Sequence, residues 1–114
     1  MIIFLKFRNK KIKVNAREVS FFGKIIGLMF SRREKAKNLL FKFSKSVNTP
    51  IHSWFVFYPF LAIWLDKKNK IIEYKKVKPF SFSIKPRREF KKLIEIPINK
   101  RNAKVVKTLD GKTD

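Results

Sequence analysis

The chain has 114 residues, of which 45% are hydrophobic and 15% aromatic, a composition that predicts one globular domain rather than a disordered segment. It has no cysteine, which excludes disulfides, zinc–thiolate sites and thiol nucleophiles, and its net charge of +21 should repel basic partners and attract polyanions. Basic residues follow the short apolar start without a cleavage site, so we expect no secretory signal and a cytoplasmic protein.

The N-terminal part is expected to form a β-hairpin and then a helix. Residues 2–8 form a strand-like run, residues 9–10 suit a tight turn, and residues 11–14 alternate between polar and apolar side chains. Over residues 16–27 apolar side chains recur at helical spacing, behind a pattern typical of a helix N-cap. We therefore predict a hairpin followed by one short helix.

The centre of the chain is its most apolar part. Residues 54–65 lack any charged or strongly polar side chain, so this run is expected to form the core. A helix that crosses a bilayer needs roughly 20 apolar residues, and this run is shorter and contains Pro59, so we expect no membrane span. We predict two buried strands on either side of a bend at residues 58–59, after a strand at residues 38–43 and a loop at residues 44–50.

The C-terminal part is expected to contain three more strands. A lysine-rich turn at residues 67–70 leads to a strand at residues 71–77, and alternating Phe and Ser predict a half-buried strand at residues 80–84. Residues 93–96 are expected to form the last main strand, and one helical turn is expected at residues 103–106.

About seven short strands and one helix predict a mainly β fold, with an α+β fold as the alternative. The expected architecture is a small jelly-roll-like sandwich or a barrel-like sheet. We assign residues 1–98 to a single β-rich domain and residues 99–114 to a weakly patterned C-terminal tail.

Five segments in a fixed order carry a family resemblance. They are Gly27-Leu28-Met29-Phe30, Leu39-Leu40-Phe41-Lys42-Phe43, His52-Ser53-Trp54-Phe55, Leu65-Asp66 and Leu93-Ile94-Glu95-Ile96-Pro97. Taken together, they resemble the small prokaryotic family called domain of unknown function 192, over roughly residues 12–98. The resemblance implies a compact, mainly β, jelly-roll-like sandwich with one short helix. It implies no established reaction, because the family has no agreed biochemical activity.

The chain departs from the family pattern around the central proline. Many members carry a Trp-Met-Lys-Asn segment before this proline and an aspartate just after it, whereas this chain has Phe55-Val56-Phe57-Tyr58 and Leu61. If those polar groups line a site in other members, this chain lacks them.

One candidate ligand site combines the single histidine with two carboxylates and a tryptophan. Its members are His52, Trp54, Asp66 and Glu95. A histidine between two carboxylates could act in acid–base chemistry or hold a metal, but the spacing matches no known motif. The structural alternatives are ordinary hydrogen bonding for His52, turn capping for Asp66, and solvent exposure or a lysine partner for Glu95. We therefore predict neither a bound metal nor a cofactor.

A second candidate site is basic. Residues 76–92 mix basic and aromatic side chains, as single-stranded nucleic-acid binders do. The candidates for polyanion binding are Lys85, Arg87, Arg88, Lys91 and Lys92. In the alternative, which we favour for the aromatic residues, Phe80 and Phe82 point into the core while the lysines lie in solvent. The sequence contains no nucleic-acid recognition signature and no glycine-rich phosphate loop.

The leading functional hypothesis is a non-catalytic binding protein whose partner is unknown. A basic nucleic-acid-associated protein is the first alternative, and a small ligand-binding protein or enzyme with a cleft near His52 is the second. The distribution of the basic side chains over the surface should separate the first two hypotheses.

Overall fold

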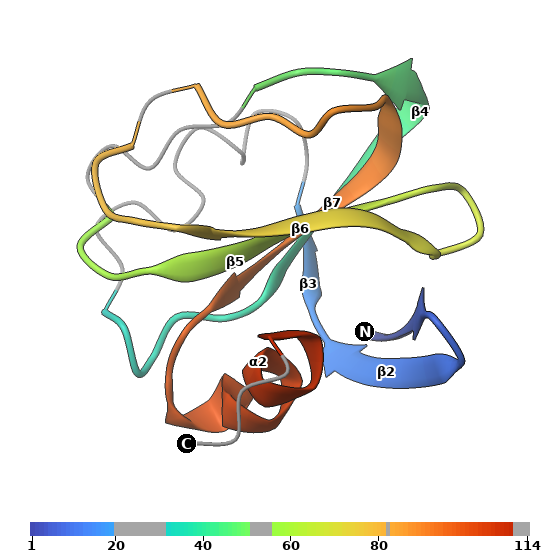
Figure 1. Ribbon diagram of the computed structural model, residues 1–114. Coiled ribbons are helices and arrows are strands. Elements are labelled where there is room, and N and C mark those ends of the chain that lie inside the picture. The colour runs from blue at the N-terminus through green and yellow to red at the C-terminus, as the bar shows by residue number, and fades with distance from the viewer. Residues whose placement is uncertain (20–31, 51–55, 82, 111–114) are drawn as a thin grey trace.

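The computed structural model describes residues 1–19, 32–50, 56–81 and 83–110 (Figure 1). These residues form seven strands in two sheets and one short C-terminal helix, which confirms a mainly β fold. The strands are β1 (Ile2–Phe7), β2 (Lys10–Asn15), β3 (Arg17–Val19), β4 (Leu39–Val47), β5 (Phe60–Leu65), β6 (Ile71–Val77) and β7 (Phe90–Pro97). A 3-10 turn η1 (Lys100–Asn102) leads into the helix α2 (Ala103–Asp110).

The predicted N-terminal hairpin is confirmed as the antiparallel pair β1 and β2. Side chains alternate along both strands, so that Ile3 pairs with Val14 and Leu5 pairs with Ile12, and all four are buried. The opposite side of each strand carries exposed residues, among them several lysines. The hairpin therefore has one apolar face, which it packs onto the larger sheet.

The larger sheet has five strands in the order β3, β4, β7, β5 and β6. Strand β3 runs parallel to β4, and the remaining neighbours are antiparallel. All six residues of β5 are buried because both faces of this strand are covered. That burial explains why residues 60–65 carry no charge in a chain so rich in lysine, and it confirms the second of the two strands predicted for the central run.

The two faces of the sheet bury two separate apolar clusters. On one face Trp64 and Phe90 pack with their ring centroids 6.3 Å apart, and Phe43 meets Phe90 edge-to-face at 5.6 Å. The other face lies under the hairpin and α2, which occupy the same side of the sheet in Figure 1. Leu109 of α2 is buried there, and the Tyr74 hydroxyl of β6 donates a 2.6 Å hydrogen bond to the Leu109 carbonyl oxygen.

The helix predicted for residues 16–27 is wrong at its start. Residues 17–19 instead form β3, in register with residues 39–41 of β4, and the Arg17 amide donates to the Asn38 carbonyl oxygen at 2.8 Å. Pairing with a distant strand outweighs the local helical spacing here, since tertiary contacts override propensity over so short a segment. The remainder of the predicted helix, residues 20–27, lies outside the described residues.

Three other boundaries differ from the sequence predictions. The predicted loop at residues 44–50 begins only after Val47, because β4 continues past an irregularity in its pairing with β7. Residues 56–57 are not in a strand, and the earlier part of that predicted strand lies outside the described residues. Strand β7 starts at Phe90, ahead of the predicted residue 93, and the helical turn predicted at residues 103–106 is confirmed within the longer α2.

The strand predicted at residues 80–84 is also wrong. Phe80 and Ser83 have positive φ angles of 59° and 41°, which turn the backbone away from an extended path. Pro79 and Pro86 flank this stretch and provide no amide for a ladder of hydrogen bonds. Ile84 makes only an isolated bridge, and Phe82 lies outside the described residues.

Candidate functional site

The structure does not bring the two carboxylates of the predicted ligand site together. Glu95 pairs with Ala62 across β7 and β5, and Asp66 follows four residues after Ala62, which places it about 13 Å further along the strand at ~3.3 Å per residue. His52 and Trp54 lie outside the described residues, so their part of this site stays a prediction. Within the ranges that the structure describes, no three acidic or histidine side chains form a group able to hold a metal ion.

Asp66 has the turn-capping role that was the structural alternative for it. Its Oδ1 atom accepts hydrogen bonds from the Lys68 amide at 2.8 Å and from the Lys70 amide at 2.9 Å. Asn69 closes the turn with a φ of 67°, a conformation that asparagine tolerates better than most residues. Asp66 therefore holds the turn between β5 and β6 and presents the surrounding lysines to solvent.

Glu95 is buried near the middle of the sheet, with 7% of its surface exposed. In β7 the side chains alternate between the two clusters, so Glu95 lies on the same side as Leu93 and opposite Ile94 and Ile96. Neighbouring strands β4 and β5 cover it at Leu39 and Ala62. Glu95 is therefore neither exposed nor close to Asp66.

The predicted polyanion-binding residues divide between two regions. Lys85, Arg87 and Arg88 are exposed in the connection between β6 and β7. Two contacts tie this connection to β6: Lys75 Nζ donates to the Lys85 carbonyl oxygen, and the Arg87 amide donates to Glu73 Oε1, both at 2.9 Å. The two others, Lys91 and Lys92, lie half-buried in β7. The five residues therefore do not form one continuous face.

An exposed pair of phenylalanines lies beside the first of these regions. Phe57 and Phe80 are 59% and 54% exposed, and their rings meet edge-to-face with centroids 5.4 Å apart. The expectation that Phe80 points into the core is therefore wrong. Its positive φ costs roughly 1–2 kcal/mol for a residue with a β-carbon and turns the ring outward from the end of β6.

Exposed lysines lie close to Phe80 in the sequence. The end of β6 and the following connection line a hollow of about 410 Å³, and Phe80 lies in the sequence between two of its lining residues, Lys78 and Ser81. The lining lysines that are exposed are Lys76, Lys78 and Lys85. We call Phe57, Phe80 and these three lysines the aromatic–basic surface.

A second basic region lies between the hairpin and the larger sheet. It is a groove of about 510 Å³, which we call the lysine groove, and its lysines come from four strands and one turn. They are Lys6, Lys11, Lys42, Lys68 and Lys92. Lys42 of β4 and Lys92 of β7 are direct cross-strand partners, so two positive side chains stand side by side. Only Lys92 of this set was among the predicted binding residues, because the others come together through strand pairing.

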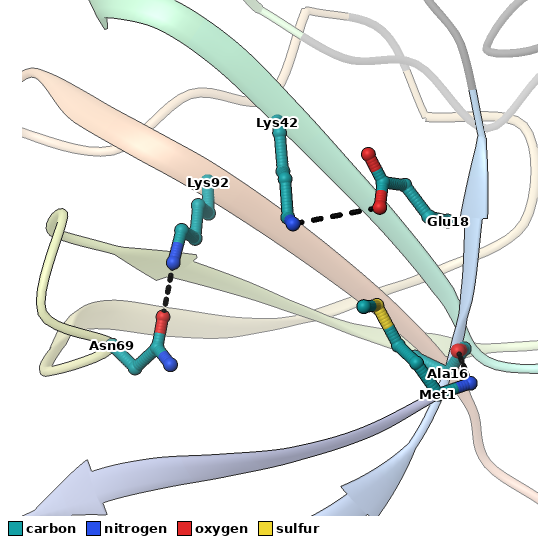
Figure 2. Close-up of polar contacts among 6 residues, drawn as sticks. All are labelled: Met1, Ala16, Glu18, Lys42, Asn69 and Lys92. Carbon is teal, nitrogen blue, oxygen red and sulfur yellow. Dashed lines mark hydrogen bonds and ion pairs between the residues drawn. The ribbon is translucent and has the colours of Figure 1, made fainter.

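Figure 2 shows the polar contacts at this groove. Lys42 Nζ lies 3.4 Å from Glu18 Oε1, and Lys92 Nζ donates to Asn69 Oδ1 at 2.6 Å. The backbone nitrogen of Met1 donates to the Ala16 carbonyl oxygen at 2.9 Å, which ties the start of β1 to the end of β2. The hairpin wall of the groove is thereby fixed next to β3.

The two basic regions lie at opposite ends of β6. The turn that carries Lys68 precedes Ile71, whereas the aromatic–basic surface begins at Lys76 near the other end of the strand. At ~3.3 Å per residue, the seven residues of β6 separate the regions by about 20 Å. They are separate sites rather than one basic patch.

Burial lowers the pKa of Lys92 below its usual value of 10.5, repulsion from Lys42 lowers this pKa further, and attraction to Asp66 raises it. The folded state therefore disfavours the charged form of Lys92. Below the lowered pKa this cost to stability is fully present, and it disappears as the pH rises through that pKa toward 10.5.

We predict that the Lys42→Met variant raises the pKa of Lys92, because it removes the repulsive neighbour. The pKa can be measured from the side-chain chemical shifts of Lys92 in an NMR titration of the wild-type protein and the variant. Lys45→Met, at an exposed position of the same strand β4, is the control and should leave the pKa of Lys92 unchanged. An unchanged titration in Lys42→Met would contradict the electrostatic coupling of the two side chains.

In the part of the chain that the structure describes, no helix is long and apolar enough to cross a membrane.

Two solved structures share this fold. One is a protein from Sinorhizobium meliloti described as a putative transcription regulator, with a TM-score of 0.75 and 18% identity over 96% of this chain and 84% of the other. The second is a protein of unknown function from Novosphingobium aromaticivorans, with a TM-score of 0.70 and 10% identity over 91% of this chain and 76% of the other. No family model and no curated protein match the sequence. At these identities the similarity shows the shared fold alone.

Proposed function

We propose that this protein acts by binding, without catalysis, and that its aromatic–basic surface takes single-stranded nucleic acid. The observation that carries the proposal is the exposed pair Phe57 and Phe80, with exposed lysines before and after Phe80 in the chain. An exposed phenylalanine held at a positive φ is costly in two ways, because it leaves apolar surface in water and strains the backbone. A ligand with a flat apolar face would offset the first of these costs.

Bases and phosphates match the two halves of this surface. Every base has a flat face that can stack on an aromatic ring, which contributes about 1–3 kcal/mol per base. The lysines at 76, 78 and 85 supply positive charge for the backbone phosphates of the same strand. In double-stranded nucleic acid the bases stack on each other, so a paired duplex does not present free faces to Phe57 and Phe80.

The net charge of +21 alone gives some affinity for any polyanion, so attraction by bulk charge must be separated from binding at this surface. For single strands the logarithm of the binding constant falls with the logarithm of salt concentration by about 0.7 per phosphate neutralised. Base stacking does not share this dependence. Affinity that persists at high salt therefore reports the aromatic part of the contact.

Family membership is a second element of the proposal. We infer that the chain is a divergent member of domain of unknown function 192, because three segments of the resemblance fall in or beside central strands: in β4, at the end of β5 and in β7. The other two segments lie outside the described residues. The S. meliloti protein with the same fold is described as a putative transcription regulator, which is compatible with a nucleic-acid ligand.

The experiment is a titration of the full chain into fluorescently labelled oligonucleotides of equal length, one single-stranded and one duplex, at increasing salt. A strand of about 12 nucleotides is long enough, since single-strand sites typically cover about 4–16 nucleotides. We expect the single strand to bind more tightly than the duplex and to remain bound at about 200 mM salt. Equal affinity for both forms that vanishes by that salt concentration would reduce the interaction to bulk charge and refute the proposal.

A further inference from the structure

The lysine groove has an excess of positive charge that its own residues do not balance. Five lysines line it, and none of its lining residues within the described ranges is a carboxylate. Lys42 and Lys92 are directly opposite each other on neighbouring antiparallel strands, an arrangement that destabilises a sheet when the charges are alike. The groove therefore concentrates positive charge at a cost to folding.

The carboxylates nearest to these lysines give little compensation. Glu18 reaches Lys42 at 3.4 Å, but both side chains are more than 40% exposed, and solvent screens such a pair strongly. The Asp66 Oδ1 atom already accepts two backbone hydrogen bonds in the turn. Lys92 has the neutral oxygen of Asn69 as its hydrogen-bond acceptor, which satisfies one of its three N–H groups and supplies no negative charge (Figure 2).

The walls of the groove are partly apolar. Exposed apolar side chains of β1, Ile2 and Phe4, lie on one side, and the lysines of β4 and β7 lie on the other. The volume of about 510 Å³ is within the range of about 300–1,000 Å³ typical of small-molecule sites. The groove thus suits a small molecule that carries a compact group of negative charges.

We propose that the lysine groove binds a small molecule with two or more linked phosphate groups, held by Lys42 and Lys92. Linked phosphates place several negative oxygens within the short distance between two cross-strand side chains, and lysine is a common phosphate ligand. The bound anion would remove the repulsion between Lys42 and Lys92. It would also reverse the effect that lowers the pKa of Lys92.

This site is independent of the proposed nucleic-acid surface, about 20 Å away along β6. Nucleoside diphosphates and inorganic pyrophosphate are two sources of the same chemistry. A nucleoside diphosphate would add a base, which Phe4 could stack against, whereas pyrophosphate would use the lysines alone.

The test is calorimetric titration of the full chain with inorganic pyrophosphate and with ADP at about 150 mM salt. The double variant Lys42→Met/Lys92→Met should weaken pyrophosphate binding by about 10-fold or more, since it removes the charge-assisted hydrogen bonds of both lysines to the phosphate groups. The matched control is Lys45→Met, which removes an exposed lysine of β4 outside the groove and should change the affinity by less than about twofold. Thermal melting of each variant, with and without pyrophosphate, confirms that it is folded.

Each result of these titrations either overturns or supports the proposed phosphate site. Equal losses in the double variant and in Lys45→Met, or no binding by the folded wild-type protein, would overturn the proposal. Tighter binding of ADP than of pyrophosphate, lost in Phe4→Ala, would support the site and identify a nucleotide as the ligand. Equal affinities for ADP and pyrophosphate would support the site and show that the phosphate groups alone determine binding.

The two proposals can fail separately. Pyrophosphate binding should survive in a Phe57→Ala/Phe80→Ala variant, and single-strand binding should survive in Lys42→Met/Lys92→Met. If oligonucleotide binding is lost only in the groove variant, the groove is the nucleic-acid site and the assignment of two sites is wrong.

Discussion

Replacing Phe80 with alanine should lower the affinity for a single-stranded oligonucleotide by roughly 5- to 150-fold, which corresponds to the loss of about 1–3 kcal/mol of base stacking. The side chain is 54% exposed, so its removal should leave no cavity in the folded protein. Because no charge is removed, the salt dependence of binding should keep its slope. Fluorescence anisotropy at several salt concentrations measures both quantities.

Phe4→Ala is the matched control for this prediction. Phe4 is a phenylalanine of similar exposure, 52%, but it lies on the hairpin rather than beside Phe57. It should change single-strand affinity by less than about twofold, whereas Phe57→Ala should weaken binding as Phe80→Ala does. Equal effects of Phe4→Ala and Phe80→Ala would mean that exposed apolar surface in general, rather than this pair, binds the strand.

Trp64→Ala should destabilise the protein by about 3–5 kcal/mol, a large part of the ~5–15 kcal/mol that keeps a domain of this size folded. Trp64 is fully buried in β5, contacts Phe90 and pairs with Leu93 of β7. Its truncation leaves a cavity between the sheet and the apolar cluster on that face. The free energy of unfolding can be measured by urea denaturation.

Trp64→Phe provides the comparison. Among the described residues, the buried indole Nε1–H of Trp64 has no hydrogen-bond acceptor, and burial of such a donor costs about 1–3 kcal/mol. Phenylalanine removes this donor while keeping an aromatic ring, so its cost should be well below that of alanine. A loss as large as that of Trp64→Ala would indicate that the indole makes a specific contact which the ring alone does not replace.

Strand β5 was predictable because its residues are all apolar and are therefore expected in the core. Residues 60–65 are free of charge in a lysine-rich chain, and a strand covered on both faces is apolar at consecutive positions; the shortness of the run and its bulky strand-forming residues favour a strand over a buried helix. The hairpin and the turn after β5 were predictable for local reasons: alternating side chains, and an aspartate that caps the turn. These features depend on near neighbours in the sequence.

Strand β3 and the outward position of Phe80 were not predictable in the same way. The sequence predicted the start of a helix at residues 16–19, but residues 17–19 pair in parallel with β4, which no local pattern reports. Alternation at residues 80–84 predicted a strand, and the positive φ of Phe80 reverses the direction of its ring. An alternation of polar and apolar residues produces one apolar face only where the backbone is extended.

The lysine groove required the three-dimensional structure. Lys42 and Lys92 become neighbours through the register of β4 and β7, and the hairpin adds Lys6 and Lys11. In the sequence these are four ordinary lysines in a chain with 29 lysines and arginines, so composition indicates polyanion binding without locating it.

The most direct test of the nucleic-acid proposal is the fluorescence of a Phe80→Trp variant titrated with a single-stranded thymidine oligonucleotide at about 200 mM salt. A base stacked on the indole at this position should quench its emission saturably, with the same midpoint as the binding curve from anisotropy. The chain has two tryptophans of its own: Trp54 is replaced by phenylalanine in this variant, and Trp64 is buried and should contribute a constant background. Binding detected by anisotropy without any quenching of the new tryptophan would place the nucleic acid elsewhere and contradict the account.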